Sequence, residues 1–250
     1  MKKILWVLFS VGLIMFIVFA TLSLVVGLKE GNNSDRKTVL NETYEDNIKN
    51  IKVNGGDAAV TIKKGDKFKV KSVAADGQFD VTSKVSGDTL NVDAENQDVM
   101  VNFNIFKDMN NEIEVTIPKN IESINVKNDR GKLIVKDINS KNSKFRVDTG
   151  MINISDSYLG NFEAYSDTGE ILTNKTHFNN GKIQCDTGEV SLNDAPADTP
   201  LNIETDTGEV RLVYSEEITN TLLDIEQDVG DAQINRKELK NKKVGSGDKL

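Results

Sequence analysis

The sequence contains few of the residue types on which many enzymes depend. Its 250 residues include one cysteine, one histidine and one tryptophan, and aromatic residues make up 6% of the chain. A single cysteine, Cys185, excludes a disulfide framework within the chain. One cysteine and one histidine, His177, argue against catalytic Cys/His chemistry and against a zinc site, because no second histidine is present. The formal net charge of −8 argues against nucleic-acid binding, which needs a basic face.

What the sequence does contain is a repeat. Its four complete copies are Asp148-Thr149-Gly150, Asp167-Thr168-Gly169, Asp186-Thr187-Gly188 and Asp206-Thr207-Gly208. A degraded copy ends at Gly230, and a forerunner ends at Gly131. Successive glycines are separated by 19, 19, 19, 20 and 22 residues. A repeat of this period indicates one supersecondary unit per copy, stacked on its neighbours.

Apolar residues alternate on both sides of each glycine. Those five positions before it are Val126, Phe145, Ala164, Ile183, Ile203 and Ile225. Those two positions after it are Leu133, Ile152, Ile171, Val190, Val210 and Ala232, and those four after it are Val135, Ile154, Thr173, Leu192, Leu212 and Ile234. Residues at even offsets share one face of a strand, so two short strands flank each turn. The sequence predicts an all-β fold, a β-solenoid made as a single-stranded, β-helix-like stack of coils.

The turn residues have a local structural role. Glycine adopts a positive φ without steric cost, and Asp and Thr oxygens can accept hydrogen bonds from nearby backbone N–H groups. Each Asp carboxylate is therefore expected to bind the N–H groups of its own turn. One coil cannot bury its apolar face alone, but coils stacked about 4.8 Å apart share a core.

The N-terminus predicts a transmembrane helix ahead of the solenoid. Lys2 and Lys3 precede an uncharged apolar run, Ile4–Leu28. As a helix this run would span roughly 37 Å, enough to cross a hydrocarbon core with some tilt. It lacks a convincing cleavage site, which favours an uncleaved signal-anchor over a cleaved signal. With the two lysines inside, the protein is expected in the cell membrane as a single-pass protein with an extracytoplasmic C-terminal domain.

The remaining chain divides by composition. The expected parts are a cytoplasmic start (1–3), a signal-anchor helix (4–28), a polar tether (29–46), a diverged β-strand cap (47–123), regular solenoid repeats (124–235) and a basic disordered tail (236–250). The tether and tail lack an apolar period.

The repeated strand–(Asp/Ser)-x-Gly-(Glu/Asp)-(Val/Ile)–strand unit behind an N-terminal anchor resembles a known bacterial family. Residues 167–171, 186–190 and 206–210 carry the resemblance, together with the opening at 51–57. It is similar to the "putative adhesin" β-strand-repeat family, which includes LiaG-like membrane proteins of Gram-positive envelope-stress operons. The resemblance implies an extracytoplasmic β-solenoid without established enzymatic activity. It implies no catalytic residues.

The stacked turns raise the question of a metal ion. Asp148, Asp167, Asp186 and Asp206 would form one column, and a divalent cation such as calcium could relieve their repulsion. Against this, calcium needs six to eight oxygen ligands, and the nonapeptide calcium-roll pattern is absent. No cofactor is expected, and calcium at these four aspartates is kept as the alternative.

Two enzymatic alternatives are weak on sequence grounds. Asp-Thr-Gly is the catalytic phrase of aspartic proteases, but those enzymes need one or two copies in an apolar cleft rather than four at the period of a coil. Polysaccharide-cleaving β-helices carry long loops with carboxylates and aromatics, whereas these coils are nearly loop-free. Cys185 falls on a buried strand face, where a thiol is inert. The protein is not expected to be an enzyme.

The expected function is a non-enzymatic binding module at the cell envelope, with a link to envelope stress. Its partners would be the membrane that it spans and a cell-wall polymer or an envelope protein, met by a strand face or by the turn column. Two alternatives stay open. The chain could regulate a membrane partner through its transmembrane helix, or its solenoids could stack end to end as a scaffold.

Overall fold

The computed structural model describes residues 36–45, 47–74, 79–96, 111–118, 120–223, 226–235, 237–238 and 242–244. Every regular element in these ranges is a β-strand, which confirms the all-β prediction. None of the described segments forms a helix of the length and apolar character needed to cross a membrane. The predicted signal-anchor, Ile4–Leu28, lies outside the described residues. All strands belong to one compact unit, Lys37–Leu250.

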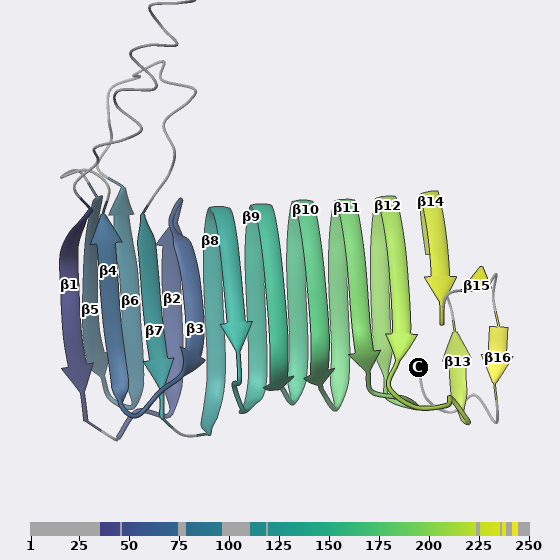
Figure 1. The fold of residues 1–250 in the computed structure, drawn as a ribbon, viewed down its shortest axis with the longest axis horizontal. Coiled ribbons are helices and arrows are strands. Elements are labelled where there is room, and N and C mark those ends of the chain that lie inside the picture. The colour runs from purple at the N-terminus through teal and green to yellow at the C-terminus, as the bar shows by residue number, and fades with distance from the viewer. Residues whose placement is uncertain are drawn as a thin grey trace, which may run out of the picture. The chain divides into compact units, whose positions relative to one another are not determined.

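The second half of this unit is the predicted solenoid, with about six turns. Its coils are β8 (Ile121–Lys136), β9 (Ser140–Tyr158), β10 (Asn161–His177), β11 (Asn180–Ala195), β12 (Leu201–Tyr214) and β14 (Glu226–Ile234). Figure 1 shows each strand from β8 to β12 folding back on itself, so that one strand forms both sides of a coil. Consecutive coils pair in parallel and in register, with each repeat glycine opposite the next.

The two sides of each coil enclose a narrow apolar core. All the predicted core residues two and four positions after the glycine are buried, except the half-buried Ala232. Five positions before the glycine, the residues from Val126 to Ile183 are buried and Ile203 is half-buried. Phe162 lies between Phe145 and Phe178, with ring centroids 6.2 and 5.6 Å away. The apolar residues that alternate in the sequence therefore form the core of the solenoid.

The first half of the unit is layered onto the β8 end of the solenoid. β2 (Asn50–Gly56) and β3 (Ala59–Lys64) pair in parallel with the first and second halves of β8, and thus act together as one further coil. β6 (Thr89–Asn96) and β7 (Glu112–Ile117) pair in parallel with β2 and β3. β5 (Phe79–Ser86) pairs with β6, and β4 (Phe68–Ala74) pairs with β7, both antiparallel. β1 (Lys37–Tyr44) in turn pairs antiparallel with β4.

Two segments correct the predicted boundaries. Residues 37–44, assigned to the polar tether, form β1, whose Leu40 and Tyr44 pack against the core. In the predicted tail, β15 (Lys237–Glu238) pairs with β14, and β16 (Lys242–Val244) pairs with β13 (Thr221–Leu223). Edge strands are held by backbone hydrogen bonds and need little apolar sequence, so their polar composition concealed them. The other residues of the predicted tail lie outside the described residues.

Candidate functional site

The Asp-Thr-Gly turns form one corner of the coils β9 to β12, and at this corner the backbones of adjacent coils are in close contact. Gly150, Gly169, Gly188 and Gly230 have φ between 142° and 145°. A Cβ on Gly169 would stand 1.8 Å from the carbonyl oxygen of Gly150, and the same clash recurs along the stack. Gly208 has no such φ, but a Cβ on Gly208 would likewise stand 1.8 Å from the carbonyl oxygen of Gly188. Glycine is therefore required at this corner because adjacent coils touch there.

The aspartates of this corner are bound by side chains on the outer face. Arg146 Nε donates to Asp148 Oδ1 at 2.7 Å, and Arg146 Nη2 donates to Asp167 Oδ1 at 2.9 Å. Asp186 accepts from Gln184 Nε2 at 3.1 Å. These bonds correct the expectation that each carboxylate binds its own turn. Residues two apart share a strand face, so the side chain two positions earlier reaches the carboxylate.

The column of aspartates is thus partly neutralised by the protein itself. One guanidinium, that of Arg146, bridges the carboxylates of two successive coils. In the part of the chain that the structure describes, no group of three or more His, Cys, Asp or Glu side chains is arranged to hold a metal ion. Calcium at Asp148, Asp167, Asp186 and Asp206 stays a prediction. A melting temperature that does not change between millimolar calcium and a chelator would remove it.

Cys185 and His177 do not form a nucleophile–base pair. Cys185 is fully buried, its Sγ lies 3.6 Å from the Gly169 carbonyl oxygen, and burial raises the pKa of its thiol to about 11. A protonated thiol inside the core is a poor nucleophile. His177 is exposed on the outside of the coil at the end of β10.

The opposite corner of the coil is made differently. Six residues after the glycine, Asp137, Asp156, Lys175 and Asp194 adopt φ between 48° and 55°, the left-handed region. Aspartate is one of the few side chains that visit this region readily. This second corner therefore turns without glycine, and each of these four coils has a polar residue there.

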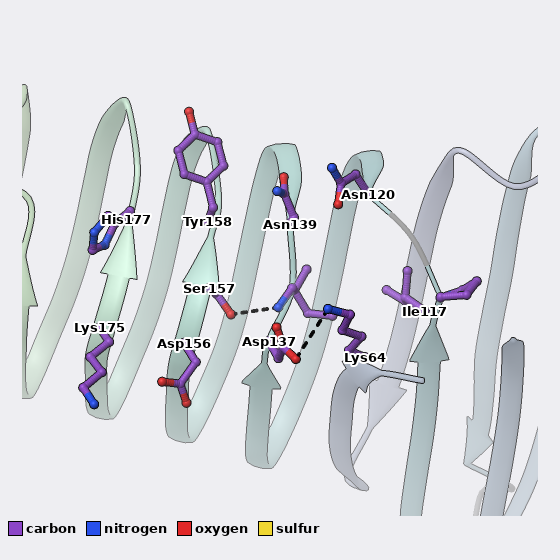
Figure 2. Close-up of a pocket in the computed structure, with 12 residues that line it drawn as sticks. Lys64, Ile117, Asn120, Asp137, Asn139, Asp156, Ser157, Tyr158, Lys175 and His177 are labelled. Atoms are coloured by element: carbon purple, nitrogen blue, oxygen red, sulfur yellow. Dashed lines mark hydrogen bonds and ion pairs between the residues drawn. The ribbon is translucent and has the colours of Figure 1, made fainter. Parts of the chain in front are cut away.

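A groove runs along this second corner. It encloses about 550 Å³, and its lining residues come from β3, β7, β9 and β10 and from the segments on either side of β8. Figure 2 shows its two rows of side chains, which are Lys64, Asp137, Asp156 and Lys175 in one row and Asn120, Asn139, Tyr158 and His177 in the other. These eight residues are exposed. The buried side chain of Ser157 lies between the rows, and the buried Ile138 also lines the groove.

The groove is held in shape by hydrogen bonds between coils. Ser157 Oγ accepts from the Ile138 N–H at 3.1 Å and donates to the Ser155 carbonyl at 2.7 Å. Tyr158 Oη donates to Asn179 Oδ1 at 2.7 Å, which anchors the ring to the next coil. Lys64 Nζ lies 3.9 Å from Asp137 Oδ2. The resulting concave surface is rigid, polar and several coils long.

The sequence alone did not predict this groove. Apart from Lys64, the residues of one row lie about 19 positions apart, too far for a short motif to bring them together. A signal was nevertheless present. Asp137, Asp156 and Asp194 each occur six residues after a repeat glycine, and aspartate at a fixed offset indicates a second left-handed turn.

Comparisons with known proteins place the chain in a family. A crystal structure of a putative cell adhesion protein from Clostridium sporogenes is 12% identical, with a TM-score of 0.43, covering 71% of this chain and 98% of that chain. A putative adhesin from Bacteroides fragilis is 13% identical, with a TM-score of 0.40, covering 81% and 97%. No curated protein matches the chain. The model of the family described as Toastrack DUF4097 matches residues 48–247, which include the coils and β2–β7. This match confirms the family resemblance seen in the repeats, and the chain belongs to the Toastrack DUF4097 family.

Proposed function

We propose that this chain is a non-enzymatic binding module of the cell envelope. The observation that carries the proposal is the groove along the second corner, where successive coils bring charged, amide and aromatic side chains into one concave surface of about 550 Å³. That volume lies within the range of ligand-binding sites in proteins. The groove crosses several coils, so it suits an extended ligand better than a compact one.

Binding accounts for this surface better than catalysis does. The one thiol is buried with a raised pKa, and three of the four repeated aspartates are paired with Arg146 or Gln184 instead of sharing a proton in an apolar cleft. Asp137 and Asp156 in the groove lie on successive coils beside Lys64 and Lys175. A row with two cationic and two anionic side chains can orient a ligand, and none of these side chains is placed to act as a nucleophile.

The location at the envelope rests on the sequence. The run Ile4–Leu28 after Lys2 and Lys3 supports a single-pass anchor with the solenoid outside the cytoplasm. The LiaG-like resemblance supports a role in the response to envelope stress. In this arrangement the solenoid would meet wall polymers or envelope proteins while the helix holds it at the membrane.

Sedimentation with purified cell-wall sacculi tests the proposal. The full-length chain, purified in detergent, is mixed with increasing amounts of sacculi, with and without calcium, and the bound fraction is measured after centrifugation. Saturable co-sedimentation is expected, with no need for calcium. No binding under either condition would contradict a wall-binding function and would redirect the search to membrane partners.

A further inference from the structure

We propose that the groove binds a neutral, hydroxyl-rich glycan chain that lies along the axis of the solenoid. This inference rests on the proposed binding function and names both the site and the chemical class of its ligand. Four observations support it: the direction of the groove, the state of its backbone, the chemistry of its side chains and the balance of its charges.

The direction of the groove fits a linear polymer with a short repeat. The rows through Asp137, Asp156 and Lys175 and through Asn139, Tyr158 and His177 advance by one coil per residue. Neighbouring strands are about 4.8 Å apart. The sugar rings of an extended glycan advance by a comparable distance, so successive rings can meet equivalent positions on successive coils.

The backbone of the groove leaves little for a peptide strand to pair with. The Asp137 N–H donates to the Ser155 carbonyl at 3.2 Å, and the Tyr158 N–H donates to the Ile138 carbonyl at 2.8 Å. A ligand along the axis crosses these strands at a steep angle and meets their side chains instead of a free edge. Addition of a peptide as an extra strand requires such an edge. Recognition at this surface therefore depends on side chains.

The side chains of the groove suit sugar rings. Tyr158 is 39% exposed, and its hydroxyl is bound to Asn179, so the ring is fixed with part of its surface open to a ligand. A flat aromatic surface packs well against the apolar face of a pyranose. The Asp137 and Asp156 carboxylates accept hydrogen bonds from hydroxyl groups, and the Asn139 amide both donates and accepts.

The charges of the groove favour a neutral ligand over an anionic one. Among its described lining residues, Lys64 and Lys175 are balanced by Asp137 and Asp156. The whole chain carries a net charge of −8. A polyanion would meet two carboxylates in the groove and long-range repulsion on approach. A neutral glycan would not be repelled, and both charge signs could bind its hydroxyl groups.

Groove variants of the full-length chain test the site. Binding to sacculi is measured in detergent for Tyr158→Ala and for Asp156→Asn, which keeps a side chain suited to the left-handed region. Each is expected to weaken binding by about tenfold, because each removes one ring contact or one charged acceptor. The matched controls are Tyr165→Ala, on the outer face of β10, and Asp194→Asn, at the same place in the repeat but outside the groove lining. Both controls should bind like the wild type.

The ligand class is tested with the same protein and two preparations of sacculi, one of them stripped of anionic polymers. Equal binding to both is expected. Loss of binding to stripped sacculi would overturn the neutral-glycan inference, and unchanged binding by the two groove variants would overturn the site. Either result leaves the proposed envelope-binding function standing. Failure of the wild type to bind even intact sacculi would contradict that function and the inference together.

Discussion

The two corners of each coil differ in what lies at the turn, which is backbone contact at one corner and exposed side chains at the other. The Asp-Thr-Gly corner is nearly identical in four coils, and there the backbones of adjacent glycines touch. The second corner carries Asp156 and Lys175 on successive coils, and their exposed side chains line a groove. The first corner thus holds the stack together by backbone contact. The second corner presents side chains by which a ligand can be recognised.

The first prediction breaks the glycine corner. Gly169→Ala places a Cβ 1.8 Å from the Gly150 carbonyl oxygen, at a φ of +145° that disfavours side chains. We expect the free energy of unfolding to fall by about 5 kcal/mol or more, the range of severe core damage. Urea unfolding of the purified chain measures it.

The control is Gly87→Ala, at a φ of +64° with no atom within 4 Å of the new Cβ. There the cost should be only the left-handed strain, roughly 1 to 2 kcal/mol. Equal losses for the two variants would contradict the role assigned to glycine–glycine contact.

The second prediction concerns the aromatic packing of the core. Phe162 is 1% exposed and packs between Phe145 and Phe178. Phe162→Ala should cost about 3 to 5 kcal/mol, since a large buried side chain leaves a cavity. Phe162→Leu should recover more than half of that loss in thermal or urea unfolding. A loss under about 1 kcal/mol for the alanine variant would show that the coil core is not close-packed.

The third prediction is a gain in stability, at a position where glycine replaces another residue. Lys175 has a φ of 48°, a left-handed conformation that costs any residue with a Cβ about 1 kcal/mol. Lys175→Gly relieves that strain but loosens the unfolded chain, so a net gain of about 0.5 kcal/mol is expected. Destabilisation by more than about 1 kcal/mol would mean that the lysine side chain itself supports this corner.

The fourth prediction concerns the ion pairs of the glycine corner, and its expected effect is as small as that of the third. Arg146 is about two-fifths exposed and pairs with Asp148 and Asp167. Arg146→Met should lower the free energy of unfolding by about 0.5 kcal/mol at low salt. The difference should shrink in 1 M salt, where screening acts within about 3 Å. A loss that is independent of salt would point to packing of the arginine stem instead.

The sequence was sufficient to predict the solenoid because its core depends on a local alternation. Val135, Ile154 and Leu192 each follow a glycine by four residues, and all are buried. The order of the layers at the β8 end could not be predicted. β2 and β3 pair with β8, which follows them by about 70 residues, and β6 and β7 pair on their far side. Such long-range pairing has no counterpart in a local pattern.

The candidate groove was beyond prediction for a related reason. His177 and Tyr158 come from different coils and share no local phrase, and they approach only when the coils stack in register. The role expected for the aspartates changed as well. Arg146 bonds to Asp148 within its own coil and to Asp167 in the next, and the second bond depends on that stacking.

We assign ligand binding to the second corner and the holding of the stack to the Asp-Thr-Gly corner. The most direct test compares two variants of the full-length chain, Asp156→Asn in the groove and Asp167→Asn in the turn column, in sedimentation with purified sacculi. We expect about tenfold weaker binding for Asp156→Asn and wild-type binding for Asp167→Asn. Weakened binding by Asp167→Asn with normal binding by Asp156→Asn would contradict this assignment and would place the ligand at the turn column.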